Sequence, residues 1–94
     1  MNIQQIIREK KGTVVDVRTA AEFQGGHVAD SINIPLPELN ARIQEIRTLE
    51  GPLLLCCASG GRSSLACNYL SQQGIQCFNG GSWMDVNYLQ SQTV

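Results

Sequence analysis

The sequence predicts a small α/β domain, in which a doubly wound, mostly parallel sheet of four to five strands carries helices on both faces. Two observations support this fold class. Apolar, β-branched segments alternate along the chain with segments of helical spacing, as in strands joined by right-handed crossovers. The segment Leu53–Cys56 contains no polar alternation, so it is expected to be buried on both faces as a central strand.

Length and composition predict a single domain over residues 1–94. The chain has 94 residues, and a second compact core would need about 100 more. Its residues are 43% hydrophobic and 16% charged, which is typical of a globular protein and not of a disordered one. No repeat, linker or low-complexity segment divides the chain.

Apolar spacing and local stop signals define the elements in the first half of the chain. Thr19, followed by Glu22 three residues later, is the capping box of a short helix. Leu39, Ile43 and Ile46 have the spacing of one buried helix face. The expected elements are a helix over 3–10, a strand over 13–17, a short helix over 19–23, a short strand over 31–34 and a helix over 37–47.

The second half is read in the same way. Gly74 is expected to end a helix as its C′ residue. The apolar stripe of that helix is formed by Leu65, Ala66, Tyr69 and Leu70. The expected elements are a strand over 53–56, a helix over 62–73, a strand over 75–78, a turn over 79–81 and a last helix over 83–89.

Charge and hydropathy exclude several classes of partner. The net charge is −1 and the pI is about 5.7, so the chain lacks the basic excess that nucleic acid or anionic lipid attracts. Aromatic residues make up only 5%, which argues against a base-stacking platform. No apolar run approaches the roughly 20 residues of a membrane span, and the start lacks a secretory signal. We therefore expect a cytoplasmic protein with no nucleic-acid or membrane partner.

The cysteine pattern argues against a disulfide framework and against a metal site. Of the four cysteines, Cys56 and Cys57 are adjacent, and none belongs to a Cys-x-x-Cys pair. His27 is the only histidine, so a Cys/His metal cage is not expected. Cys67 and Cys77 are expected to be reduced thiols that serve as small core residues.

The loop after the central strand has the composition of an anion-binding thiolate site. Ligands of such sheets bind beyond the carboxyl ends of the strands, and this loop follows Cys56, the expected last strand residue. Its small residues allow backbone amides to curl into a nest, and the next helix directs its positive N-terminus at the same point. Arg62 is the only formally charged residue between Gly51 and Met84. These surroundings are expected to lower the pKa of Cys57 enough to hold it as a thiolate without a histidine base.

The segment Cys57-Ala58-Ser59-Gly60-Gly61-Arg62-Ser63 resembles the active-site loop of the rhodanese family, Cys-x-x-Gly-x-Arg-Ser/Thr. Further motifs of that family match in order, namely Asp16-Val17-Arg18 with Glu22-Phe23, Gly26-His27-Val28, Asn33-Ile34-Pro35 and Gly80-Gly81. The resemblance covers about Val14 to Trp83. Three features depart from the family pattern: Asp30-Ser31 replaces Gly-Ala, Trp83 lies closer to the glycine pair, and the first strand, normally ahead of the N-terminal helix, has little room beyond Ile3. Asp30 tolerates left-handed backbone angles better than most residues do.

The resemblance implies a thiosulfate sulfurtransferase in which Cys57 is the catalytic nucleophile. It would take sulfur from thiosulfate or a similar small anionic persulfide donor, and pass it to cyanide or to a thiol, that of a protein included. No metal or organic cofactor is required. Substrate and persulfide would be held by Ala58, Ser59, Gly60, Gly61, Arg62 and Ser63.

Two alternatives remain open at the level of sequence. Counted from Cys56, the run to Arg62 has the Cys-x5-Arg spacing of a tyrosine phosphatase, although Leu55 stands where that family has histidine and Asp85 is the only acid downstream. A non-catalytic binding or sulfur-carrier module of the rhodanese type is the other alternative.

Three further groups outside the loop are expected to support the structure. Asp16 and Arg18 end a strand at the same sheet edge, and we expect a structural ion pair or loop support from them. His27 is expected to be a hydrogen-bonded turn residue, and Glu22 a helix cap.

Overall fold

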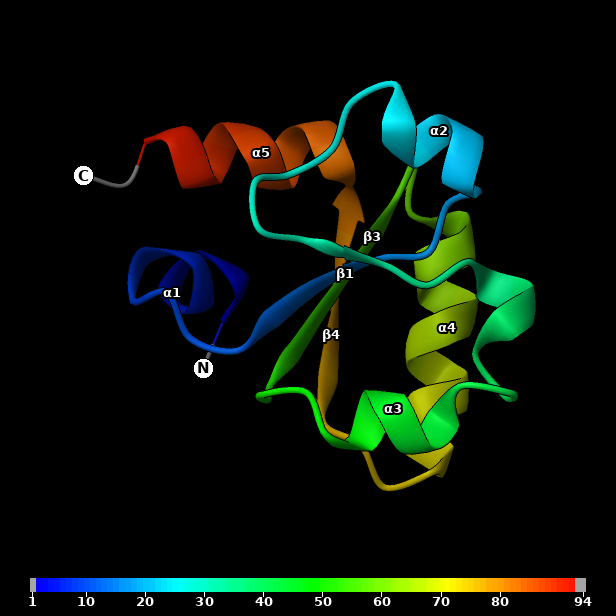
Figure 1. Cartoon of the computed structure of the whole chain (residues 1–94). Helices are drawn as coiled ribbons and strands as arrows, with labels where there is room; N and C mark the ends of the chain where they lie inside the picture. The colour runs from blue at the N-terminus through cyan, green and yellow to red at the C-terminus, as the bar shows by residue number, and fades with distance from the viewer. Residues whose placement is uncertain (1, 93–94) are drawn as a thin grey trace.

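The computed structural model describes residues 2–92 and contains a four-stranded parallel sheet in the order β2-β1-β3-β4 (Figure 1). The strands are β1 (Thr13–Asp16), β2 (Ile32–Asn33), β3 (Leu53–Cys57) and β4 (Cys77–Ser82). The helices are α1 (Ile3–Arg8), α2 (Ala20–Gln24), α3 (Ile43–Arg47), α4 (Gly61–Gln72) and α5 (Trp83–Ser91), with a 3-10 turn η1 (Leu36–Glu38). The predicted α/β class is confirmed, with four strands.

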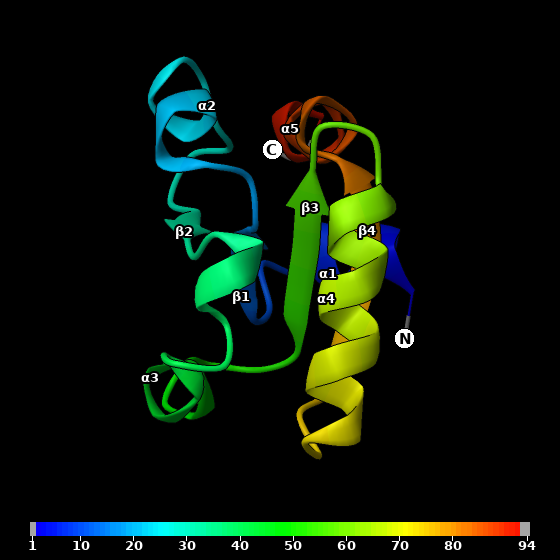
Figure 2. The same ribbon diagram turned by 90° about the vertical axis from the view of Figure 1, so that its right-hand side faces the viewer.

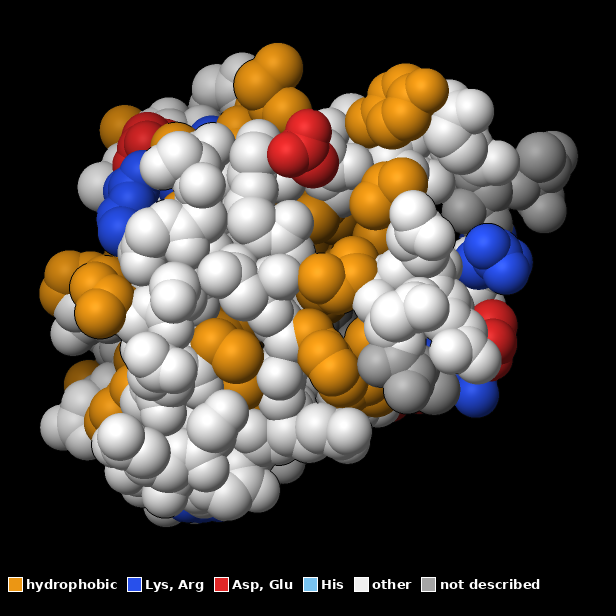
Figure 3. Space-filling model, turned by 180° about the vertical axis from the view of Figure 1, so that it is seen from behind, with side chains coloured by type: hydrophobic (Ala, Val, Ile, Leu, Met, Phe, Trp, Pro, Cys, Tyr) orange, Lys and Arg blue, Asp and Glu red, His pale blue; other side chains and the backbone are white. Residues whose placement is uncertain are grey.

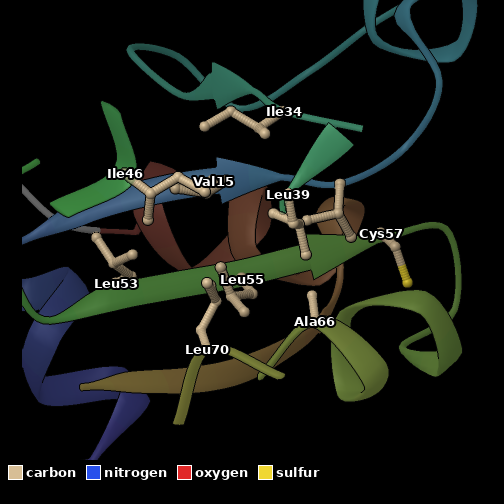
Figure 4. Packing of buried hydrophobic residues seen from close by; sticks show 10 residues of the cluster. Val15, Ile34, Leu39, Ile46, Leu53, Leu55, Cys57, Ala66 and Leu70 are labelled. Carbon is tan, nitrogen blue, oxygen red and sulfur yellow. The ribbon is translucent and has the colours of Figure 1, made fainter. Parts of the chain in front are cut away.

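Helices cover both faces of the sheet, as predicted. Figure 2 shows α4 in front of β3 and β4, with α1 behind them. The larger core cluster lies between the sheet and helices α3 and α4. It includes Leu55, Ala66 and Leu70 (Figure 4). A smaller cluster under α1 and α5 includes Ile7 and Val86. No helix within residues 2–92 combines the length and the hydropathy needed to cross a bilayer.

The central strand β3 divides its side chains between these two clusters. Because successive strand residues point to opposite faces, Leu53, Leu55 and Cys57 join the α4 side. Leu54 and Cys56 join the α1 and α5 side. All five residues of β3 are buried, as the absence of polar alternation predicts. The strand extends one residue beyond the predicted end, so Cys57 and not Cys56 is its last residue.

The helix predicted over 37–47 is interrupted. The chain forms η1, then turns, and α3 begins only at Ile43. Pro35 and Pro37 have no amide hydrogen to donate, and Asn40 has low helix propensity and accepts a hydrogen bond from the Tyr69 hydroxyl (2.7 Å). The predicted burial is nevertheless largely correct, because Leu39 and Ile46 are buried and Ile43 packs beside them.

The turn predicted over 79–81 is wrong, because those residues belong to β4. The strand begins at Cys77 and continues past a bulge, where Cys56 pairs with Gly81 and Gly80 is passed over. Gly80 is required there, since a Cβ would lie 2.9 Å from Val86 Cγ2 and 3.1 Å from the Leu55 carbonyl oxygen. The glycine pair in the sequence therefore marks a β-bulge and not a chain reversal.

Helix α4 differs from its prediction in one face residue. Leu65 is 61% exposed, because the buried face runs through Ser63, Ala66 and Leu70, at helical spacing from one another. Its predicted end is confirmed. Gly74 adopts a φ of 79°, and the Ile75 amide donates to the Leu70 carbonyl (3.0 Å) in a Schellman motif.

The remaining differences are boundary shifts. Helix α1 stops at Arg8, two residues early, because Lys10 has a φ of 54°. Helix α5 continues to Ser91, two residues beyond its predicted end. Asp30 has a φ of 66°, the left-handed conformation that its side chain tolerates.

Candidate active site

The sulfur of Cys57 lies at the carboxyl end of β3 and faces the loop and the first turn of α4 (Figure 4). Its Sγ accepts hydrogen bonds from the amides of Gly60 (3.0 Å) and Ser63 (3.4 Å), and the Ser63 hydroxyl lies 3.4 Å away. The loop turns sharply at Gly60, which has a φ of 104°, a conformation that favours glycine. The predicted convergence of backbone amides on this sulfur is thus present for at least two of the amides in 58–63.

Hydrogen bonds dominate the ionisation of this thiol. Desolvation raises the pKa of Cys57, but hydrogen bonds from the Ser63 hydroxyl and amide, and from the amides of Gly60 and Ser59, outweigh it. The pKa falls from an ordinary value of 9.0 to about 7. Cys57 as a whole is only 1% exposed, yet the groups that face its sulfur are polar donors. The arrangement therefore stabilises a thiolate near neutral pH.

Ser63 is itself held by a residue of the neighbouring strand. Its hydroxyl has one proton and three acceptors within reach: Asn79 Oδ1 (2.6 Å), the Gly60 carbonyl oxygen (3.2 Å) and the Cys57 sulfur (3.4 Å). The Asn79 amide group donates in turn to that same Gly60 carbonyl (3.3 Å), and Asn79 Oδ1 accepts from the Gly81 amide (2.9 Å). Asn79 therefore ties the loop and α4 to the β4 bulge.

Arg62 is paired with a carboxylate from a distant part of the sequence. Its Nη1 and Nη2 donate to the two carboxylate oxygens of Glu22 over 2.7 and 3.0 Å. The hydrogen bond from Arg62, followed by that from the Thr19 amide, lowers the pKa of Glu22 to about 2. Glu22 also completes the predicted capping box with Thr19. The Glu22 carboxylate thus caps the N-terminus of α2 and also offsets the charge of Arg62 in the first turn of α4.

Asp16 and Arg18 form a buried ion pair, as expected. Arg18 Nη2 donates to Asp16 Oδ2 (2.8 Å) and to the Gly26 carbonyl oxygen (2.6 Å). Its guanidinium lies 4.7 Å from the ring centroid of Trp83. Asn33 Nδ2 donates to the carbonyl oxygens of both Asp16 (3.0 Å) and Arg18 (2.9 Å). The pair therefore joins β1, β2, the loop after α2 and the start of α5 at the edge of the sheet that carries Cys57.

Side chains alternate between the two faces of the sheet along β3, so Cys56 points away from the face to which Cys57 points. It is fully buried on the α1 and α5 side. Burial, followed by the nearby charge of Asp16, raises its pKa to about 12. A nucleophile must be ionised and face its substrate, so these facts contradict the Cys-x5-Arg phosphatase alternative.

Other candidate residues are exposed, and Ser59 acts on Cys57 through its backbone amide. His27 is exposed, its Nδ1 lies 2.7 Å from the Phe23 carbonyl oxygen, and its ring stacks on that of Phe23 at 3.7 Å. Ala58, Ser59 and Gly61 are exposed on the loop. Within residues 2–92, no group of three or more His, Cys, Asp or Glu side chains is arranged to hold a metal ion.

Two residues of this site were not identified as such from the sequence. The sequence predicts only a capping role for Glu22, although its place in the motif that follows Asp16 is a usable signal. The sequence predicts a turn at Asn79, and nothing in the local sequence indicates that Asn79 reaches Ser63. That contact arises only when β4 pairs with β3 beside α4.

Comparison with known proteins gives one consistent family. The model of the rhodanese-like domain matches residues 2–84. The uncharacterized protein YqhL of Bacillus subtilis is 42% identical over 65 residues, which cover 69% of this chain and 51% of YqhL. The thiosulfate sulfurtransferase GlpE of Pseudomonas savastanoi pv. phaseolicola is 36% identical over 71 residues, covering 76% of this chain and 66% of GlpE. The chain therefore spans about half to two thirds of the length of these relatives.

Solved structures give the same fold. A rhodanese-related protein from Thermoplasma volcanium superimposes with a TM-score of 0.77 and 31% identity, covering 94% of this chain and 88% of that one. A rhodanese with anions from E. coli gives a TM-score of 0.69 and 32% identity, covering 78% of this chain and 88% of that one.

Proposed function

This chain belongs to the rhodanese-like domain family of sulfurtransferases, and we propose that it transfers sulfane sulfur through a persulfide on Cys57. One observation carries the proposal. The Cys57 sulfur accepts hydrogen bonds from backbone amides at the start of a helix, and its pKa is about 7. A thiolate held in this way is a nucleophile that needs no separate base.

In the first step, the Cys57 thiolate attacks the outer sulfur of thiosulfate. An S–S bond forms to Cys57, the S–S bond of thiosulfate breaks, and sulfite leaves with the electron pair. Amides that stabilise a thiolate also stabilise a persulfide anion, so one set of donors serves both states. Because Cys57 is 1% exposed, the donor must approach its sulfur past the exposed loop residues Ala58, Ser59 and Gly61.

In the second step, an acceptor attacks the outer sulfur of the persulfide. Cyanide leaves as thiocyanate, and a small-molecule or protein thiolate leaves as a persulfide, while Cys57 returns as a thiolate. No electron donor is consumed with cyanide. The four free cysteines are consistent with action in a reducing compartment such as the cytoplasm.

The proposed substrate-binding groups are the amides of Ala58 to Ser63, with Arg62 at the rim of the loop. The guanidinium attracts the dianionic donor, although its pairing with Glu22 reduces that attraction. We propose that Asp16 and Arg18 support the loop edge from below and take no part in bond making.

The test is the mass of the protein after incubation with thiosulfate. We expect a gain of about 32 Da, one sulfur atom, which cyanide removes as an equal amount of thiocyanate. Trypsin places Cys56 and Cys57 together in the peptide over 48–62, where fragmentation locates the added sulfur.

The adjacent cysteine offers a matched control. Cys57→Ser is expected to abolish both the mass gain and thiocyanate formation, whereas Cys56→Ser is expected to retain both within about twofold. Circular dichroism verifies that each variant is folded. Persistent turnover by Cys57→Ser, or loss of turnover only in Cys56→Ser, would overturn the proposal. Absence of any mass gain with thiosulfate and with glutathione persulfide would favour a non-catalytic module.

A further inference from the structure

A second pair of cysteines lies in contact on the α4 side of the sheet. Cys67 is in the middle of α4, and Cys77 is the first residue of β4. Their Sγ atoms are 3.0 Å apart, and the Cys77 thiol also donates to the Cys67 carbonyl oxygen over 3.4 Å. Both are free thiols that are partly buried against the core. The sequence predicted two separate core residues and gave no sign of their contact.

This pair is remote from the candidate active site. In the register of β3 and β4, Cys77 lies opposite Leu53, whereas Ser82 lies opposite Cys57. The two positions are four steps apart along β3, a rise of roughly 13 Å. Because the Cys67 sulfur contacts that of Cys77 at this distance from Cys57, its natural reaction partner is Cys77.

We propose that Cys67 and Cys77 form a redox-active dithiol, which a low-molecular-weight disulfide such as oxidised glutathione converts reversibly into a disulfide joining α4 to β4. One protein thiolate attacks oxidised glutathione and expels a glutathione thiolate, leaving a mixed disulfide. The second protein thiolate then attacks the protein sulfur of that mixed disulfide and expels the second glutathione. Two protein thiols are oxidised, one small disulfide is reduced, and the two protons pass to the two glutathione thiolates. The proposal is independent of sulfur transfer at Cys57.

The geometry requires little movement. A disulfide bond is about 2.05 Å long, so the sulfurs need to approach by about 1 Å. The two side chains come from elements that already pack against each other. Helix α4 and strand β4 are also joined by the Ser63–Asn79 hydrogen bond (2.6 Å), so the backbones on both sides of the new bond are held in place.

The surroundings keep the pair reduced until an oxidant is supplied. Cys67 and Cys77 pack with other partly buried apolar side chains, Tyr69 and Ile75 among them, against the larger core cluster. Figure 3 shows that apolar side chains also reach the surface of the molecule on the face opposite to that of Figure 1. Burial, followed by the hydrogen bond with Cys77, raises the pKa of Cys67 to about 11. Since the thiolate is the attacking species, exchange at this thiol is slow at neutral pH compared with that at Cys57.

Mass spectrometry after incubation with oxidised glutathione tests the proposal in the full chain carrying Cys57→Ser, which removes the faster competing thiol. Arg62 is the last tryptic site, so Cys67 and Cys77 fall together in the peptide that begins at Ser63, apart from Cys56. We expect that peptide to become about 2 Da lighter without retaining glutathione, and to recover its mass with dithiothreitol. Chymotryptic cleavage at Tyr69 should yield two peptides linked only by the disulfide.

Single-serine variants supply the matched controls. Cys67→Ser and Cys77→Ser should each lose the 2 Da decrease and retain one glutathione instead. The oxidised parent should melt about 5–10 °C above the reduced parent, because the bond restricts the unfolded chain, and neither variant should show this difference. Free Cys67 and Cys77 after prolonged oxidation, or a stable mixed disulfide in the parent, would overturn the proposal. Sulfur transfer by the wild-type protein is measured separately, so failure of either proposal leaves the other intact.

Discussion

At the scale of single residues, two adjacent cysteines acquire opposite chemistry because they lie on opposite faces of one strand. Burial raises the pKa of Cys56 to about 12, whereas hydrogen bonds lower the pKa of Cys57 to about 7. The side chains are identical, so the difference comes entirely from their surroundings. The donors that matter come from the start of α4, and Ser63 supplies two of them.

The pH dependence of alkylation tests the ionisation of Cys57. Because its pKa is near 7, the rate with iodoacetamide should rise through that pH and level off before pH 9. The pKa is lower in the folded chain than in the unfolded one. Ionisation of Cys57 therefore stabilises the fold above pH 9, and this contribution is lost as the pH falls through 7. A rate still rising steeply above pH 9 would contradict the assignment.

Ser63→Ala tests the hydroxyl donor. We expect the pKa of Cys57 to rise from about 7 toward its ordinary value of 9.0, because the Ser63 hydroxyl is the strongest single influence that lowers it. Thiolate absorbance near 240 nm as a function of pH measures the change. Ser59→Ala is the matched control, since Ser59 acts through its backbone amide, which the substitution retains. Equal behaviour of the two variants would show that the hydroxyl has no part in the ionisation.

At the scale of secondary-structure elements, the site depends on how α4 is joined to its neighbours. Asn79 links the first turn of α4 to β4, and Glu22 links the same turn to α2. Neither link joins residues that are close in sequence. The helix that shapes the loop is therefore positioned by elements on either side of it.

Glu22→Gln tests the link between α2 and α4. Glutamine can retain the capping box, so the substitution removes mainly the ion pair with Arg62. Without the Glu22 carboxylate, the Arg62 guanidinium should attract thiosulfate more strongly. KM for thiosulfate should therefore fall by about two- to fivefold at low ionic strength, with little change in kcat.

Added salt provides the control for this prediction. At about 1 M salt the Debye length is about 3 Å, and the difference between Glu22→Gln and wild type should disappear. A higher KM in Glu22→Gln would instead show that the ion pair positions the loop.

At the scale of the whole molecule, the buried Asp16–Arg18 pair connects segments from both halves of the chain. Replacement of Asp16 by alanine leaves Arg18 buried without its counter-ion, and we expect a loss of about 3–5 kcal/mol in the free energy of unfolding. Urea denaturation measures it, with Arg18→Ala and the double variant completing a thermodynamic cycle. A double variant whose loss equals the sum of the two single losses would show that the two side chains do not interact.

The fold class and the position of the loop could be predicted from the sequence because they depend on local patterns. The unbroken apolar run of β3 and the glycine-rich segment after it specify the strand, turn and helix around Cys57. The β4 bulge and the Cys67–Cys77 contact could not be predicted, because both depend on pairing between distant segments. The helix expected over 37–47 failed for a local reason, since two prolines near its start oppose the helix that the apolar spacing favours.

Because Cys56 is buried, the rate at which its thiol is modified measures how often the native structure opens. A maleimide can modify Cys56 in the native state only during excursions in which β3 separates from α1 and α5. Cys57 is 1% exposed and faces the opposite side of the sheet, so its labelling reports opening of that side instead. The rate of Cys56 labelling, relative to that in the unfolded chain, converts into the energy of those excursions when reclosing outpaces labelling. The same measurement in living cells requires no fluorophore and no engineered residue.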